Sequence, residues 1–310
     1  MKNLLTGALL LGLTACGSSS PTPTPTPTKT VNDIVLTPTQ LSLPLTTFDA
    51  GTYPLMSVLV GASIYFGNGS NSGTTQFLTR YDLSSNTFSS PLAVSTNVCF
   101  CGYSSKLVSD GVNIFYIAND ATKYTASSNT WTTINYPTTA RDNAGEAGVT
   151  YYNGNIYYLG GRTPSNLFKY YSIAQNSWFT APNYLYATNR SQMAVYKDRI
   201  YVLGGTNAAK KMASFSTSTN TWTPLADTPF TVNASYDSIY TAVLGDDLYI
   251  LQGETVYIYD LVKDVWATAP AKLSNLPSAA NLFSDGQNLY IAGQNASRIP
   301  AVVKVVVSVK

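Results

Sequence analysis

Five segments of this 310-residue chain carry the same spaced pattern of residues, and this repetition restricts the possible folds more than any other feature. Each segment has an aromatic residue, Asn or Asp five positions later, and Trp or Phe two positions after that. The five sets are Tyr81, Asn86 and Phe88; Tyr124, Asn129 and Trp131; Tyr171, Asn176 and Trp178; Phe215, Asn220 and Trp222; and Tyr259, Asp264 and Trp266. Because chance is an implausible source of this agreement, the chain is predicted to consist of repeated structural units.

A second recurring unit lies upstream of each pattern and consists of a turn pair, an apolar residue, an aromatic residue and usually glycine. Its six aromatic positions are separated by 50, 42, 44, 48 and 41 residues, and they are Tyr65, Phe115, Tyr157, Tyr201, Tyr249 and Tyr290. Turn pairs such as Asn153-Gly154 favour positive φ and therefore two-residue hairpins between antiparallel strands. No segment shows an apolar period near 3.6 over a helical length. Each unit is therefore predicted to be a meander of short antiparallel strands.

A repeat of this length built from four strands predicts a β-propeller. The glycine pairs Gly160-Gly161 and Gly204-Gly205, followed by the spaced aromatic residues, resemble the kelch repeat, most closely over residues 153–178 and 198–222. The resemblance covers residues 31–310 and implies an all-β, six-bladed kelch-type propeller. The first, second, fifth and sixth units depart from the glycine pair, which affects their boundaries rather than the architecture.

The number of units indicates how the ring closes, since there are six second-strand units but five complete aromatic ends. Residues 32–38 resemble residues 264–270, the fourth-strand segment of the fifth unit, with Val35 near the position of Trp266. We predict that this N-terminal strand completes the last blade, which closes the ring and leaves no unpaired edge.

The N-terminal residues are predicted to be a signal peptide rather than a membrane anchor. Lys2 is followed by an apolar run at residues 8–13 that is far shorter than the roughly 20 residues of a membrane-spanning helix. Residues 13–16 resemble the lipobox of bacterial lipoproteins, which implies cleavage before Cys16 and acylation of this residue, palmitate included. The alternative is an ordinary secretory signal with a chance cysteine. Gly17 follows Cys16, and in the enterobacterial sorting pattern this implies the outer membrane.

The segment between this cysteine and the repeats has the composition of a stalk. Residues 17–30 read GSSSPTPTPTPTKT, and proline at every second position fixes φ and removes amide donors. We expect an extended polyproline II segment of about 40 Å that holds the propeller away from the membrane.

Composition excludes several classes of function. The chain has no histidine, which excludes Ser-His-Asp and Cys-His catalysis and histidine-ligated zinc or copper. Its 18 Lys and Arg residues against 16 Asp and Glu residues, without a basic run, give no electrostatic footprint for nucleic acid. We predict no cofactor and no dedicated metal site, and the low charged fraction of 11% favours an extracytoplasmic location.

The variable connections of the predicted meanders all emerge on one face, around the mouth of the central channel, and binding residues concentrate on such loops. The charged and aromatic candidates there are Arg141, Asp142, Glu146, Arg162, Tyr184, Tyr186, Arg190, Tyr236 and Asp237. Arginine matches a carboxylate and tyrosine offers a flat face with a polar tip, which suits a sugar or an acidic sugar. The alternative is that Arg141 and Arg190 pair with Asp142 and Glu146 and tie neighbouring blades together. The repeated Tyr and Trp residues are predicted to pack between blades rather than to bind ligand.

Cys99 and Cys101 are predicted to form a disulfide in an oxidising compartment, although a bridge between residues i and i+2 closes a strained ring. Two free thiols, or soft-metal binding or redox activity, are the alternatives.

Three functions fit these features. The first is a membrane-anchored binding protein that recognises a glycan or a protein partner on its loop face. The second is an enzyme similar to the periplasmic kelch proteins that epimerise or mutarotate sialic acids, in which Arg141 would bind a carboxylate, Glu146 would transfer protons and Arg190 would orient the sugar. The third is a structural subunit of an envelope complex. The absence of histidine disfavours copper oxidases of the kelch type, and we predict the binding protein.

Overall fold

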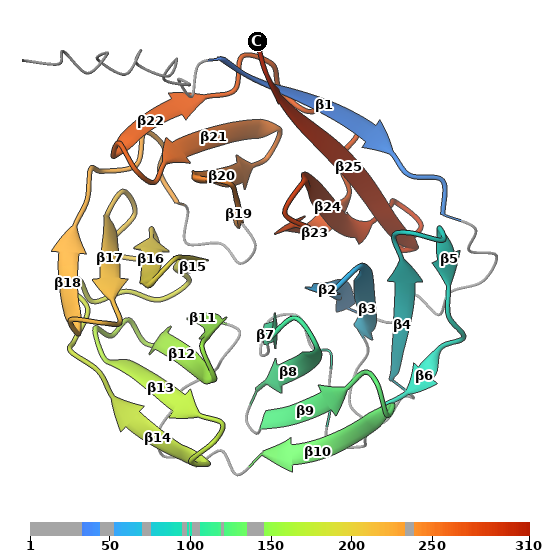
Figure 1. Ribbon diagram of the computed structural model, residues 1–310, viewed down its shortest axis with the longest axis horizontal. Coiled ribbons are helices and arrows are strands. Elements are labelled where there is room, and N and C mark those ends of the chain that lie inside the picture. The colour runs from blue at the N-terminus through green and yellow to red at the C-terminus, as the bar shows by residue number, and fades with distance from the viewer. Residues whose placement is uncertain are drawn as a thin grey trace, which may run out of the picture.

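Six antiparallel sheets surround a central channel in the computed structural model (Figure 1). The structure describes residues 33–43, 53–69, 76–94, 98, 100, 106–118, 121–134, 146–232 and 239–310. The fold is therefore the predicted six-bladed β-propeller. Within the described residues, no helix has the length and apolar character needed to cross a bilayer.

Each blade contributes its strands in chain order from the channel outwards, except that the last blade takes its outermost strand from the N-terminus. Blade one contains β2 (Tyr53–Val60), β3 (Ser63–Gly69), β4 (Phe77–Asp82), β5 (Thr87–Phe88) and β6 (Leu92–Ala93), and blade two contains β7 (Lys106–Ser109), β8 (Asn113–Ile117), β9 (Ala121–Thr125) and β10 (Thr130–Ile134). Blade three contains β11 (Ala147–Tyr152), β12 (Asn155–Gly160), β13 (Phe168–Ser172) and β14 (Ser177–Thr180), and blade four contains β15 (Gln192–Tyr196), β16 (Arg199–Leu203), β17 (Met212–Ser216) and β18 (Thr221–Pro224). Blade five contains β19 (Tyr240–Leu244), β20 (Asp247–Gln252), β21 (Thr255–Asp260) and β22 (Val265–Thr268), and blade six contains β23 (Ser278–Ser284), β24 (Asn288–Gln294), β25 (Pro300–Val309) and β1 (Ile34–Gln40).

Ring closure by the N-terminal strand is confirmed. β1 pairs with β25 along its whole length, from Ile34 opposite Val309 to Gln40 opposite Val303. The predicted register is wrong by three residues. Val305 of blade six occupies the position that Tyr259 has in blade five. Pro38 lies opposite Val305 and so takes the position of Trp266, which was predicted for Val35. A proline is tolerated there because β1 is the outer edge strand of its sheet, where one side of the backbone needs no partner.

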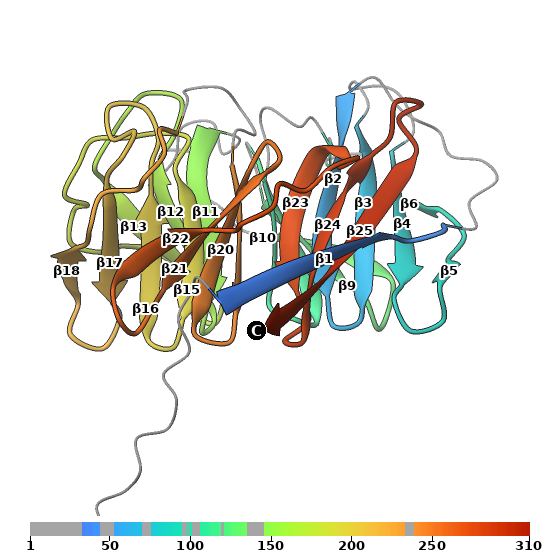
Figure 2. The same ribbon diagram turned by 90° about the horizontal axis from the view of Figure 1, so that it is seen from above.

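The two faces of the ring differ in the connections they carry (Figure 2). One face, here called the tight-turn face, holds the turn between the first and second strands of every blade and the turn between the third and fourth strands of blades one to five. The opposite face, here called the loop face, holds the longer connections, as predicted. The first-to-second turn has two residues in four blades but three in blades two and six, where Asp110 and Asp285 accept amide hydrogen bonds across the turn.

The third-to-fourth turn explains the repeated Asn or Asp. This turn has four residues, and its last residue has a φ between 50° and 58° in blades one to five. Asn and Asp tolerate this left-handed conformation better than most residues. In blade two the Tyr124 hydroxyl also donates a hydrogen bond to Asn129 Oδ1 at 3.1 Å, and Tyr81, Tyr171 and Tyr259 bond to the equivalent residues. The repeated pattern of an aromatic residue, Asn or Asp, and Trp or Phe is therefore the signature of one turn.

The hydrophobic core is divided into six clusters, one at each boundary between adjacent blades. At the boundary between blades three and four, Phe215 and Trp222 of blade four pack against Phe168 of blade three, with ring centroids 5.1 and 5.0 Å apart. The prediction that the repeated aromatic residues pack between blades is confirmed.

Buried tyrosines make the propeller sensitive to high pH. Burial raises the pKa of Tyr157 to about 12, and burial together with the hydrogen bond to Asp285 raises the pKa of Tyr290 to about 12. A raised pKa means that the folded protein favours the neutral phenol, so the stabilisation is complete below pH 10 and is lost as the pH rises from 10 to 12. We expect the melting temperature to fall over this window, and less steeply in Tyr157→Phe. A melting temperature that stays constant to pH 12 would contradict this assignment.

Candidate functional site

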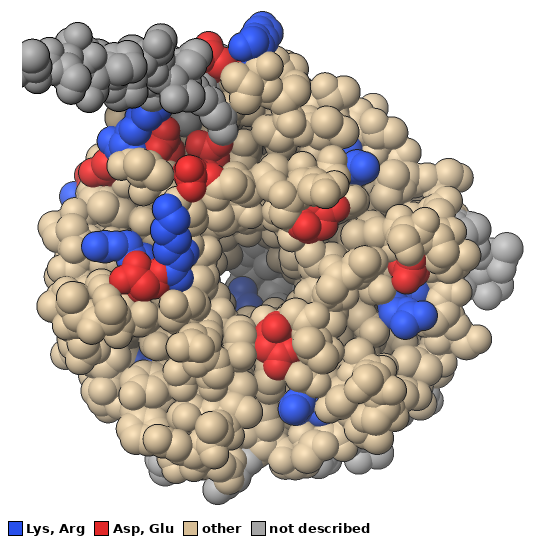
Figure 3. Space-filling view, viewed as in Figure 1, with Lys and Arg blue, Asp and Glu red and all other residues tan. Residues whose placement is uncertain are grey.

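The central channel is bounded by the innermost strands β2, β7, β11, β15, β19 and β23 and encloses a cavity of about 320 Å³. Figure 3 shows it opening on the tight-turn face. Lys106 is the one charged residue among the described residues that line the cavity, and it begins β7 at the end nearest the loop face. The described lining therefore mixes apolar and polar residues and places one positive charge near the loop-face mouth of the channel.

Strand register places six equivalent positions at one level of the channel, just inside its loop-face mouth. They are Met56, Lys106, Gly148, Gln192, Tyr240 and Asn281. Asn281 Nδ2 donates to the carbonyl oxygen of Ser57 in the next blade at 2.9 Å. A Cβ atom on Gly148 would lie 2.6 Å from Ser191 Oγ, so glycine at this level leaves room for the neighbouring blade.

The two glycine pairs of the sequence enclose the segment 188–191, which enters blade four at the mouth. A Cβ atom on Gly160 of blade three would lie 2.4 Å from the carbonyl oxygen of Thr188, and one on Gly205 of blade four would lie 2.3 Å from that of Asn189. Both glycines also have positive φ, of 73° and 100°. Gly160 and Gly205 are therefore required by the close approach of this segment as well as by the backbone conformation.

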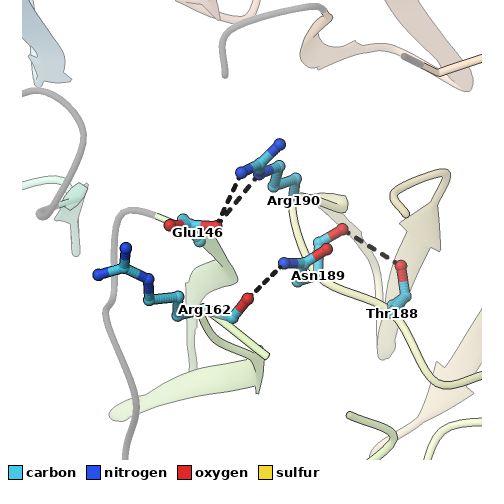
Figure 4. A network of polar contacts seen from close by, with 5 residues as sticks. All are labelled: Glu146, Arg162, Thr188, Asn189 and Arg190. Atoms are coloured by element: carbon cyan, nitrogen blue, oxygen red, sulfur yellow. Dashed lines mark hydrogen bonds and ion pairs between the residues drawn. The ribbon is translucent and has the colours of Figure 1, made fainter. Parts of the chain in front are cut away.

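This segment places Arg190 against Glu146 of blade three (Figure 4). Arg190 donates to Glu146 Oε2 from Nε at 3.2 Å and from Nη2 at 3.0 Å, and its amide donates to the Glu146 carbonyl oxygen at 2.6 Å. The side chain of Glu146 is 4% exposed and that of Arg190 is 24% exposed. This contact agrees with the alternative interpretation, in which Arg190 pairs with Glu146 and ties two neighbouring blades together. Two guanidinium donors of Arg190 are engaged in the pair.

The other described candidates divide between surface and core. Arg162 is exposed, and in Figure 4 its guanidinium lies on the other side of Glu146 from Arg190, while its carbonyl oxygen accepts a hydrogen bond from Asn189 Nδ2 at 2.9 Å. Tyr186 is half-buried. The expectation that Tyr184 faces a ligand is wrong, because this residue is 2% exposed and packs on Trp222 with ring centroids 4.7 Å apart. Its ring fills the boundary between blades three and four.

Sequence reasoning missed the polar residues next to Arg190. Asn189 Oδ1 and Ser191 Oγ are buried and have no hydrogen-bond partner among the described residues. Buried polar atoms in proteins are commonly satisfied by ordered water. No sequence motif marks these residues. The glycine pairs that lie against this segment were the only sequence signal of its close packing. Lys106 was missed as well, because only the register brings it to the channel.

Seven predicted site residues lie outside the described part of the chain, and they are Cys16, Cys99, Cys101, Arg141, Asp142, Tyr236 and Asp237. In the part that is described, no three His, Cys, Asp or Glu side chains come together as a set of metal ligands.

Comparison with known proteins finds a likeness among solved structures. No protein-family model matches the sequence, and no curated protein matches it. Among solved structures, the chain resembles the one described as "Structure of YjhT", with a TM-score of 0.51 over 63% of this chain and 74% of that chain. This chain folds as a β-propeller. The two sequences are 17% identical, so the likeness of the propeller to this structure concerns the fold alone.

Proposed function

We propose that this propeller is a lipid-anchored binding protein of the cell envelope. Its loop face binds the partner and is held away from the membrane. The observation that carries the proposal is the position of β1. Ile34 pairs with Val309, and the amide of Lys310 donates to the carbonyl oxygen of Asp33 at 2.9 Å, at the tight-turn face. Because β1 begins at the face opposite the loops (Figure 2), a stalk that ends at residue 33 would join the propeller on that face.

The partner is a glycan or a protein that contacts the loops around the channel mouth. Exposed Arg162 and half-buried Tyr186 supply polar and aromatic contact area there. Glu146 counts against the enzymatic alternative, because its carboxylate is buried and engaged by Arg190 rather than open to a substrate. The propeller then acts as a rigid scaffold for binding loops.

Orientation is testable by energy transfer in liposomes that contain an acceptor lipid. Exposed Lys197 of the tight-turn face and exposed Lys210 of the loop face are replaced by cysteine, one at a time, in full-length protein that carries Cys99→Ser and Cys101→Ser, and are labelled with a donor dye. We expect greater transfer from position 197 than from position 210, because the first lies nearer the bilayer. Equal transfer, or greater transfer from position 210, contradicts the orientation. Cys16→Ser is the control, and it should remain unbound and show no transfer.

A further inference from the structure

Two exposed leucines lie on the loop face, both next to the boundary between blades three and four. Among the described residues, eight large apolar side chains are exposed, and six of them belong to tight turns, outer strands or the end of β25. The remaining two are Leu167, in the loop between β12 and β13, and Leu185, in the loop between β14 and β15, which are 47% and 43% exposed. Within the described part of the loop face, exposed large apolar side chains are therefore confined to one place.

Hydrogen bonds hold the two loops rigidly together. Ser165 and Thr188 exchange backbone hydrogen bonds of 3.0 and 3.1 Å, and the Tyr184 amide donates to the Asn166 carbonyl oxygen at 2.8 Å. Leu167 and Leu185 directly follow the residues joined by this last bond. The buried ring of Tyr184 anchors the second loop from below. A partner would therefore meet a preformed surface and would not lose affinity to loop ordering.

Among the described residues, the loop-face connections of blades three and four carry an excess of positive charge. Connections 161–167, 181–191 and 204–211 hold Arg162, Arg190, Lys210 and Lys211, whereas the acidic residues are Glu146, just before β11, and Asp227, just after β18. Both acids are already in ion pairs, Glu146 with Arg190 at 3.0 Å and Asp227 with Lys211 at 2.9 Å. Neither Arg162 nor Lys210 has an ion pair with a described residue. Lys211 Nζ also lies 5.9 Å from the ring centroid of Tyr186.

We propose that these loops bind an acidic segment of a partner protein that also carries apolar side chains. The docking patch consists of Arg162, Leu167, Leu185, Tyr186, Lys210 and Lys211. The leucines supply the buried apolar contact, and the unpaired charges of Arg162 and Lys210 select an acidic partner. Leucine has no flat ring on which a sugar stacks, which favours a polypeptide over an anionic glycan. The inference rests on the proposed function, since it takes the loop face as the binding face.

The test uses a displayed library of random 12-residue peptides and the full lipidated chain in nanodiscs. We expect the selected peptides to be enriched in Asp and Glu together with Leu, Ile, Val and Phe, relative to the input library. The dissociation constant of a selected peptide should rise at least tenfold in Arg162→Glu/Lys210→Glu and in Leu167→Ser/Leu185→Ser. Raising the salt concentration should weaken its binding.

Matched control variants carry the same changes on the tight-turn face. Lys197→Glu/Lys310→Glu alters the net charge by the same amount, and Val112→Ser/Val262→Ser replaces two exposed apolar residues of tight turns. Both controls should bind the peptide within twofold of the unaltered chain. Selection of neutral or basic peptides, no selection at all, or equal loss of binding in the controls would overturn the docking patch.

A second probe separates this inference from the proposed function. If polygalacturonate binds, and Arg162→Glu/Lys210→Glu abolishes this binding while Leu167→Ser/Leu185→Ser does not, the loop face binds an anionic glycan. That result overturns the protein partner and leaves the proposed function intact. Failure of the orientation measurement in liposomes would instead remove the proposed function itself.

Discussion

Deleting residues 34–40 is expected to abolish the cooperative unfolding transition of the propeller. The deletion removes seven residues that pair with β25 and takes fully buried Ile34 out of the cluster between blades five and six. Burial of one such side chain contributes about 1.5–3 kcal/mol, and a domain of this kind is stable by only about 5–15 kcal/mol in total. The loss of a whole strand and the exposure of the β25 edge therefore consume much of the stability. Circular dichroism during thermal or urea unfolding gives the measurement.

Two controls separate closure from a general effect of truncation. Removing residues 17–30, the predicted stalk, should leave the unfolding midpoint and slope unchanged. A synthetic peptide of residues 33–43, added to the deleted chain, should restore part of the transition, because the strand joins its blade only by pairing with β25 and by packing. A deletion variant that unfolds like the full chain would refute closure by β1.

Replacing Arg190 by methionine is expected to destabilise the protein by about 3 kcal/mol, since it leaves the buried carboxylate of Glu146 without its charged partner. Removing the carboxylate as well, in Glu146→Leu/Arg190→Met, should recover most of this loss, because a buried ion pair and an apolar pair of similar volume are often equally stable. Urea unfolding of the two variants measures both effects.

The exposed ion pair of Lys211 with Asp227 provides the matched control. Its side chains are 42% and 49% exposed, so Lys211→Met should cost less than about 1 kcal/mol. If Arg190→Met lowers the free energy of unfolding no more than Lys211→Met does, the contact between Glu146 and Arg190 does not tie blades three and four together. Arg190 would then again be a candidate ligand-binding residue.

Much of the fold follows from local chemistry that the sequence displays. The Asn or Asp of the repeat ends a four-residue turn in the left-handed conformation, and the Tyr and Trp on either side of it pack at a blade boundary. These are short-range requirements, so they recur at fixed spacing and can be counted. The register of β1 was less predictable, because the outer edge strand of blade six has no Trp and little else to fix its position.

The candidate site was predictable only in part. The loop face and the pairing of Glu146 with Arg190 were anticipated, the second as an alternative to ligand binding. Tyr184 was misassigned because a tyrosine in a loop looks the same whether its ring faces solvent or, as here, the core. Asn189, Ser191 and Lys106 carry no motif, since their importance comes from neighbours that are distant in the chain.

By itself the sequence determined the number of blades, the origin of the closing strand and the face that carries the variable loops, because each of these depends on turns and spacings within about 50 residues of chain. Only the tertiary structure decided which polar side chains are free and which are engaged. Blades three and four bring Glu146 and Arg190, 44 residues apart, into one ion pair and leave Arg162 exposed. Such contacts form between repeats, where burial and charge depend on the packing of adjacent blades rather than on any local pattern.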